Sequence, residues 1–140
     1  MCLYMLPITR QFPGQAIYRC EHGSLHLAWD GNLLSFSEED LQTLIVFIDR
    51  IESGAENAVA QKIQIYRRKA ASGMPLVEIW IEQYGLRLSG RDFKKLRRML
   101  TEAADWLAVQ PPFIAQDHIH TARIQQFIDL QFTRPLIFQN

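Results

Sequence analysis

The chain has 140 residues and a mass of 16.3 kDa, which is enough for one domain that buries a substantial hydrophobic core without covalent cross-links. Hydrophobic residues make up 48% and charged residues 21%, which excludes a wholly disordered chain. Basic and acidic residues number 15 each, so the chain as a whole has no electrostatic pull toward nucleic acid or a membrane surface.

The first residues show no targeting or membrane signal. Their apolar run ends at Pro7 and has no basic residue before it, which is too short for a signal-peptide core. No stretch approaches the ~20 apolar residues that a membrane-spanning helix needs. Cys2 and Cys20 are the two cysteines, so we expect no disulfide framework and predict a cytoplasmic location with no membrane contact.

The most informative feature is an internal repeat with an offset of 52 residues. Segment 25–44 matches segment 77–96 in its apolar positions and in its Ser and Asp positions. Two copies indicate a duplicated unit, because a solenoid needs about three. We therefore predict a single domain over 1–140, with repeats at about 15–54 and 61–108. The matched apolar pairs are Leu25/Val77, Leu27/Ile79, Trp29/Ile81, Leu34/Leu86 and Phe36/Leu88.

Each repeat carries the same order of local signals. Alternating apolar and polar residues predict half-buried strands, and Asp, Gly and Asn between them predict turns. Ser37 and Ser89 each precede an Asp by three residues, which is an N-cap pattern. The strands are predicted over 16–20, 25–29 and 34–36 in the first repeat, and over 62–67, 77–81 and 86–88 in the second.

A helix follows each cap. Leu41, Leu44 and Ile48 share one face of the first helix, and Phe93 and Leu96 begin the stripe of the second. The predicted fold is therefore α+β: an antiparallel sheet from a duplicated strand-strand-strand-helix unit, with two main helices packed on one face. A C-terminal extension over 113–140 is expected to add a third helix at 113–131 and an apolar tail at 136–138.

One segment resembles a known family. The run Cys20-Glu-His-Gly-Ser-Leu-His-Leu, then Gly31-Asn32-Leu33 and Phe36-Ser37, is similar to the opening of a small uncharacterised bacterial domain family. That family has a Cys/His-Gly-x-Ile/Leu-His strand, an Asn-Leu turn and a Ser-capped helix. The resemblance covers roughly residues 18–52, and it implies no activity because none is attached to the family.

Cys20, His22 and His26 are the candidate metal ligands, because zinc binds thiolate and imidazole. Their spacing fits no standard zinc pattern. If His22-Gly23 is a two-residue turn, Cys20 faces Leu25, and His26 faces Arg19 on the opposite side of the sheet. Cys20 is then a core residue, and only a wider turn would bring the three together. We therefore expect no metal and no other cofactor from the sequence.

Charge is unevenly distributed along the chain. Segment 1–60 has three basic and eight acidic residues, net −5, whereas segment 61–98 has ten basic and three acidic residues, net +7. The basic segment over 67–98 predicts contacts with phosphates, through counterion release. The competing interpretation, which we favour, pairs it with the acidic first helix or with a second subunit. The polyanion-binding candidates are Arg67, Arg68, Lys94, Lys95 and Arg98.

Three hypotheses for function follow. No phosphate-binding loop, nucleophile elbow or zinc-protease motif is found, and the sequence thus favours a non-enzymatic interaction or regulatory domain, with a homodimer and a protein partner as the expected assemblies. Its interface candidates are Trp80, Trp106 and Phe138. The alternatives are nucleic-acid or polyanion binding through 67–98, and metal binding by Cys20 with histidines.

Overall fold

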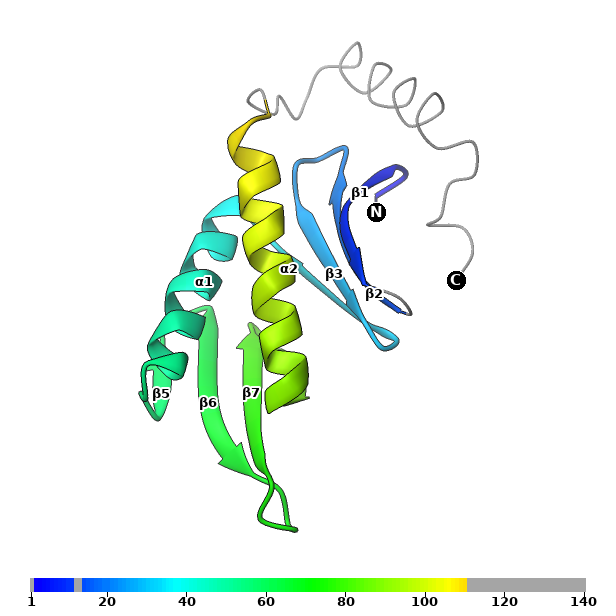
Figure 1. Ribbon diagram of the computed structural model, residues 1–140. Coiled ribbons are helices and arrows are strands. Elements are labelled where there is room, and N and C mark those ends of the chain that lie inside the picture. The colour runs from blue at the N-terminus through cyan, green and yellow to red at the C-terminus, as the bar shows by residue number, and fades with distance from the viewer. Residues whose placement is uncertain (1, 12–13, 111–140) are drawn as a thin grey trace.

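The computed structural model describes residues 2–11 and 14–110. Within them the chain folds into two four-stranded antiparallel sheets and two helices, in the order β-β-β-β-α twice (Figure 1). The first repeat contains β1 (Met5–Gln11), β2 (Gln15–Cys20), β3 (Leu25–Trp29), β4 (Asn32–Phe36) and α1 (Glu38–Glu52). The second contains β5 (Asn57–Val59), β6 (Ile63–Lys69), β7 (Pro75–Ile81), β8 (Tyr84–Ser89) and α2 (Gly90–Ala108).

The α+β class and the duplicated unit are confirmed. Leu25 pairs with Phe36 in the first sheet as Val77 pairs with Leu88 in the second. Trp29 and Ile81, the matched pair at the far ends of β3 and β7, are both 3% exposed. The two repeats therefore bury equivalent side chains, as the offset of 52 residues predicts.

The arrangement of strands differs from the prediction in two respects. Each repeat has four strands where three were predicted; the additional strands are β1 and β5, each at the edge of its sheet. The strands also form two sheets where one was expected. Strand β1 contains Pro7, and its register with β2 shifts between Pro7 and Thr9, which obscures the alternation. Strand β5 has three residues, too few for a periodic signal.

Each helix packs on strands of the other repeat, and α2 also packs on strands of its own repeat. Helix α1 packs against β5 and β6 of the second sheet and against α2, whereas α2 contacts β1 and β2 as well as β7 and β8 (Figure 1). Thr9 of β1 donates a hydrogen bond of 2.7 Å to Oε2 of Glu102 on α2. Buried residues from both sheets and both helices form one hydrophobic cluster. The repeats thus share one core, and the molecule cannot be divided into two separately packed halves.

Both helices begin where the Ser-x-x-Asp pattern predicts. The Ser37 side chain accepts from the Asp40 backbone N–H at 3.1 Å, and the Asp40 carboxylate accepts from the Ser37 N–H at 2.9 Å, which completes a capping box. Ser89 accepts from the Asp92 N–H in the same way. The Asp40 carboxylate also forms an ion pair of 2.8 Å with Lys62, which leads into β6.

Asp40 is expected to give the protein an acid-sensitive contact. Burial alone would raise the pKa of Asp40, but the bonds from Lys62 and Ser37 outweigh it and hold that pKa below the ordinary 3.8. The carboxylate therefore stabilises the fold above about pH 4, and this contribution disappears as the pH falls through the lowered pKa. We expect Asp40→Asn to cost about 1 kcal/mol at pH 7 and to flatten the acid limb of stability. Urea unfolding from pH 7 to pH 2 measures both effects, and an unchanged acid limb would contradict the assignment.

Trp80, predicted as an interface residue, is half-buried and engaged within its own sheet. Its ring lies over Gly85, its cross-strand partner, where an added Cβ would be 2.8 Å from the ring. Its indole N–H donates to Oε1 of Glu78 at 2.7 Å. The first repeat places Ala28 opposite Leu33 at the equivalent pair, so each repeat combines one small and one large residue. Trp80 thus has contacts within its own sheet, and its role as an interface residue stays a prediction.

The other interface candidates lie at or beyond the end of α2. Trp106 is half-buried in the last turn of the helix, where its carbonyl accepts from the Val109 N–H. Phe138, the predicted helix at 113–131 and the tail at 136–138 lie outside the described residues. Homodimerisation stays a prediction. No helix in the described part of the chain is long and apolar enough to cross a membrane.

Candidate metal centre

The turn between β2 and β3 sets the register of the hairpin. The Cys20 N–H donates to the Ser24 carbonyl and the Gly23 N–H to the Cys20 carbonyl, so the loop has three residues, with Gly23 at φ 83°. Tyr18 therefore pairs with His26, and Arg19 with Leu25. The predicted two-residue turn was wrong by one position, which moves a whole set of side chains to the other face of a sheet. As a result, Cys20 and His26 lie on the same face.

The N-terminal segment brings a second cysteine to this hairpin. The Glu21 carboxylate, in the turn, accepts hydrogen bonds from the Leu3 N–H at 2.7 Å and from the Tyr4 N–H at 3.0 Å. Burial alone would raise the pKa of Glu21, but these two bonds outweigh it and lower the pKa below 4.5. The ionised carboxylate holds residues 3 and 4 against the turn, and Cys2 therefore lies directly beside Cys20.

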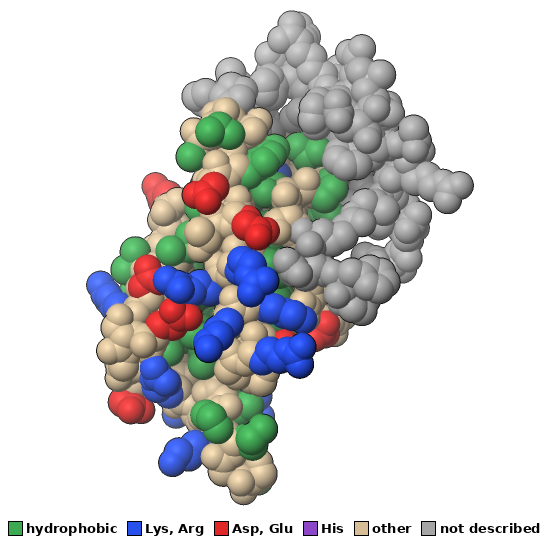
Figure 2. All heavy atoms as spheres, viewed as in Figure 1, with side chains coloured by type: hydrophobic (Ala, Val, Ile, Leu, Met, Phe, Trp, Pro, Cys, Tyr) green, Lys and Arg blue, Asp and Glu red, His purple; other side chains and the backbone are tan. Residues whose placement is uncertain are grey.

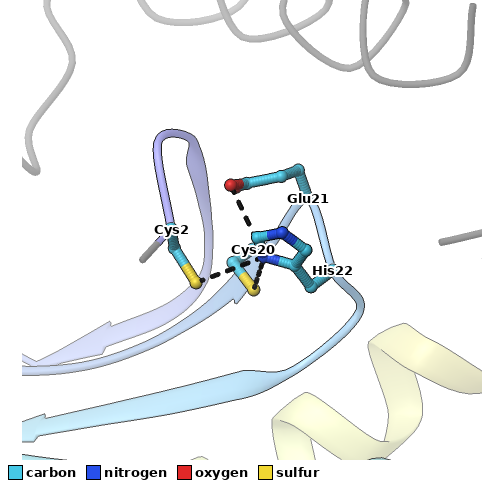
Figure 3. A group of neighbouring side chains, drawn as sticks. All are labelled: Cys2, Cys20, Glu21 and His22. Atoms are coloured by element: carbon cyan, nitrogen blue, oxygen red, sulfur yellow. Dashed lines mark hydrogen bonds and ion pairs between the residues drawn. The ribbon is translucent and has the colours of Figure 1, made fainter. Parts of the chain in front are cut away.

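Ligand atoms of Cys2, Cys20, Glu21 and His22 lie within 4.8 Å of one another at this point (Figure 3), and His26 lies beside Cys2 at the edge of this group. The Sγ atom of Cys2 lies 3.7 Å from Nδ1 of His22 and 3.4 Å from Nε2 of His26. The Sγ atom of Cys20 lies 3.9 Å from the same Nδ1 of His22. Cys2 comes from the N-terminal segment, Cys20 from the end of β2, His22 from the turn and His26 from β3.

These separations match a tetrahedral zinc site. With Zn–S near 2.3 Å and Zn–N near 2.05 Å, the sulfur–nitrogen edge of a tetrahedron is about 3.6 Å. The three sulfur–nitrogen separations lie between 3.4 and 3.9 Å. One ion could therefore reach Cys2, Cys20 and His22 with small side-chain movements, whereas His26, which is outside the group of mutually close ligand atoms, would have to move closer to it.

The surroundings of His26 favour it as a ligand. The residue is 7% exposed, and its Nδ1 atom lies 2.8 Å from the Ser35 hydroxyl of β4. That bond fixes the ring so that Nε2 points at Cys2. A metal-binding histidine usually has its second nitrogen engaged in this manner. Cys20 is 2% exposed, so the inner side of the cluster is shielded from water.

Glu21 is the fourth member of the close group, and it competes with His26 for the role of fourth ligand. Its Oε1 atom lies 3.5 Å from Nδ1 of His22. Both of its oxygens already accept backbone N–H groups, from Leu3 and Tyr4, and coordination of a metal would compete with those bonds. Soft thiolate donors also combine with imidazole more commonly than with carboxylate in closed zinc sites. We therefore assign Glu21 to positioning and His26 to the ligand set.

The two thiols differ in protonation. Burial raises the pKa of the Cys2 thiol to about 12, and the neighbouring Cys20 and Glu21 add to the effect. Burial would also raise the pKa of Cys20, but hydrogen bonds with His26, Cys2 and His22 outweigh it and lower the pKa to about 6. These opposite shifts favour the thiolate at Cys20 and the thiol at Cys2 in the free site. A bound cation would release the Cys2 proton.

The cluster is confined to the first repeat. The β6–β7 turn closes with the same pair of hydrogen bonds, but Ala70 occupies the place of Cys20. Glu78 and Arg87 pair where His26 and Ser35 pair in the first sheet. Sequence reasoning named Cys20, His22 and His26 but missed Cys2, since no local pattern connects the N-terminus to a turn 20 residues away.

The basic candidates are divided by the structure between internal contacts and an open cleft. Arg67, Arg68, Lys94 and Arg98 line the cleft, whereas Lys95 does not. Arg97, which was not among the candidates, forms ion pairs with Asp49 at 2.9 Å and Glu52 at 3.0 Å on α1. The basic helix α2 and the acidic helix α1 are thus joined by ion pairs, as the favoured interpretation predicts. Among the described residues, Arg97 is the α2 side chain that forms them.

Comparison with known proteins gives no relative: no protein-family model, no curated protein and no solved structure matches the chain. The resemblance of residues 18–52 to an uncharacterised family stays a prediction. The candidate site is therefore argued from its own geometry.

Proposed function

We propose that this protein binds one zinc ion through Cys2, Cys20, His22 and His26, and that the ion has a structural or regulatory role. The sequence alone disfavoured a metal. The observation that carries the proposal is the set of sulfur–nitrogen separations, 3.4 to 3.9 Å, among donors from four separate places in the chain. Two thiolates and two imidazoles are a donor set that selects zinc over magnesium, calcium or manganese.

The role follows from the number of ligands. Four protein donors close the coordination sphere of zinc, whereas a catalytic zinc keeps a position open for water or substrate. The ion would fasten the N-terminal segment to the β2–β3 hairpin, where the Glu21 carboxylate already holds residues 3 and 4. This supports a non-enzymatic protein whose N-terminal segment is held or released according to zinc supply.

Cobalt(II) titration of the full-length, tag-free protein under reducing conditions tests the proposal. We expect saturation at one ion per chain, with the intense visible bands of tetrahedral cobalt and a near-ultraviolet thiolate charge-transfer band, and displacement of both by zinc. Cys2→Ser should lose the charge-transfer intensity of one thiolate and weaken binding by about tenfold or more. Absence of tetrahedral bands in the wild-type protein would overturn the proposal.

Two matched variants decide the fourth ligand. His26→Ala removes a donor and should abolish the tetrahedral spectrum. Glu21→Gln keeps one oxygen to accept a backbone N–H and should retain the spectrum with weaker affinity, because it affects only the position of residues 3 and 4. The reverse result, in which Glu21→Gln alone removes the spectrum, would replace His26 by Glu21 in the ligand set.

A further inference from the structure

A second candidate site is a wide cleft between α2, the C-terminal end of α1 and the β6–β7 hairpin. Its volume is about 1290 Å³, which exceeds the roughly 300–1,000 Å³ of small-molecule pockets. Figure 2 shows basic side chains gathered over the N-terminal half of α2 on this face. Six cationic residues line the cleft: Arg67, Arg68 and Lys69 of β6, and Lys94, Arg97 and Arg98 of α2.

Three of these cations have internal partners. Arg97 pairs with Asp49 and Glu52, as described above. The Arg67 guanidinium donates to the Ala55 carbonyl at 2.9 Å and to the Ile51 carbonyl, at the end of α1. Arg68 lies over the Tyr66 ring, with its Nε atom 3.9 Å from Glu78. The contacts of Arg67 and Arg97 fix two guanidinium groups on the walls of the cleft, whereas the Arg68 guanidinium is held beside Tyr66 and Glu78, which do not line it.

The remaining three cations have no such partner. Within the described residues, Lys69, Lys94 and Arg98 form no ion pair with a carboxylate. All three are exposed. The acidic side chains on the cleft are Glu52, Glu56 and Glu102; Arg97 occupies the first, and Thr9 donates to the last. The cleft therefore has an excess of cations that the fold itself does not neutralise.

One wall of the cleft is an addition to the repeat. Arg67 pairs with Val77 at the position where Arg19 pairs with Leu25 in the first sheet. Beyond that pair, the β6–β7 hairpin continues for two further pairs before its turn, Arg68 with Leu76 and Lys69 with Pro75. The first repeat reaches its turn without them. All four added residues line the cleft, and strand alternation places Lys69 and Pro75 on the same sheet face as Arg67, with Arg68 and Leu76 on the other.

We propose that this cleft binds the phosphate backbone of a single-stranded nucleic acid. Lys94 and Arg98 are one helical turn apart, about 6 Å along the axis, which is close to the spacing of successive phosphates in an extended strand. The Arg98 guanidinium, which forms no ion pair within the described residues, suits bidentate contacts to phosphate oxygens. Pro75, which is exposed, and Leu76, which is half-buried, supply apolar surface for sugars and bases.

Fluorescence anisotropy with the full-length protein and a labelled DNA strand of about 12 nucleotides tests the proposal. With three free cations, we expect the logarithm of affinity to fall against the logarithm of salt with a slope of about −2. The double variant Lys94→Gln/Arg98→Gln should weaken binding by about tenfold or more. No binding at about 50 mM salt, or binding that ignores salt, would overturn the proposal.

The same helix offers a matched control. Arg91→Gln/Lys95→Gln removes the same charge at the same spacing, but neither residue lines the cleft, and binding should weaken by less than about threefold. If both double variants weaken DNA binding equally, the loss of affinity reflects only the change in net charge, and the proposal that the cleft is the binding site is wrong. If a polyglutamate peptide competes as well as unlabelled DNA strand does, the ligand of the cleft is an acidic protein and the proposal is wrong. If duplex DNA binds more tightly than the single strand, the assignment to a single strand is wrong. No zinc ligand lines the cleft, so Cys2→Ser should bind DNA normally and the two proposals fail separately.

Discussion

Removal of zinc should lower the melting temperature of the protein by roughly 5–10 °C. A ligand at about 100 times its dissociation constant stabilises the folded state by about 2.7 kcal/mol, which for a domain of this size corresponds to a shift of that order. The effect should depend on pH, because thiol and imidazole must lose their protons to bind the ion. Thermal unfolding with zinc and with excess chelator, under reducing conditions, measures the shift.

The location of the effect is as informative as its size. Without the ion, residues 2–4 depend on Glu21 for their attachment, so the Leu3 and Tyr4 amides should exchange faster with solvent after chelation. The matched variant is Cys2→Ser, since Cys2 is only partly buried and its loss leaves the core intact. At the same zinc concentration, chelation should lower its melting temperature by about half as much as in the wild type, or less. Identical wild-type melting curves, with zinc measured as bound in one and absent in the other, would refute a structural role.

Separation of the two repeats should leave both halves unfolded. A chain of residues 1–56 retains α1 but lacks β5 and β6, on which α1 packs. Five side chains of α1 are buried: Leu41, Leu44, Phe47, Ile48 and Ile51. At about 2 kcal/mol each, their exposure would cost on the order of 10 kcal/mol, as much as the whole stability of a typical domain.

Circular dichroism and urea unfolding of the fragments 1–56 and 57–140 measure this effect. We expect neither fragment alone to unfold cooperatively, and an equimolar mixture to regain helix, because α2 in the second fragment supplies the surface that β1 and β2 need. The intact chain should unfold in one transition. A cooperative transition in an isolated fragment, or two transitions in the intact chain, would show that the helices do not tie the repeats together.

The proposed zinc cluster lies in the first repeat, whereas the basic cleft is lined mainly by the second repeat together with Ile51 and Glu52 of α1, and both sites use departures from the repeat. The zinc cluster has Cys20 and His26 where the second repeat has Ala70 and Glu78. The basic cleft depends on a hairpin extension that the first repeat lacks. The two repeats therefore differ in the residues that form these sites, whereas their buried positions are equivalent.

The sequence by itself determined whatever depends on near neighbours in the chain. Alternation at Leu25, Leu27 and Trp29 specified a strand, and the Ser37 and Asp40 pair specified where α1 begins, because strand periodicity and helix capping act over a few residues. The offset of 52 residues then carried the same assignment to the second repeat. The α+β class followed from these local signals alone.

Only the tertiary structure decided the register, the packing of each helix on the other repeat, and both sites. One extra residue in the turn after Cys20 placed His26 on the same face as that cysteine, and alternation is equally satisfied by either register. Cys2 joined the cluster through bonds between Glu21 and the N-terminal backbone, and such contacts leave no periodic trace. Likewise, charge counting found the basic segment, but the packing of α2 on α1 directed Arg97 inward and left Lys94 and Arg98 facing the cleft. Long-range packing and turn geometry are properties of the folded chain, and for this reason they separate residues that the sequence presents as alike.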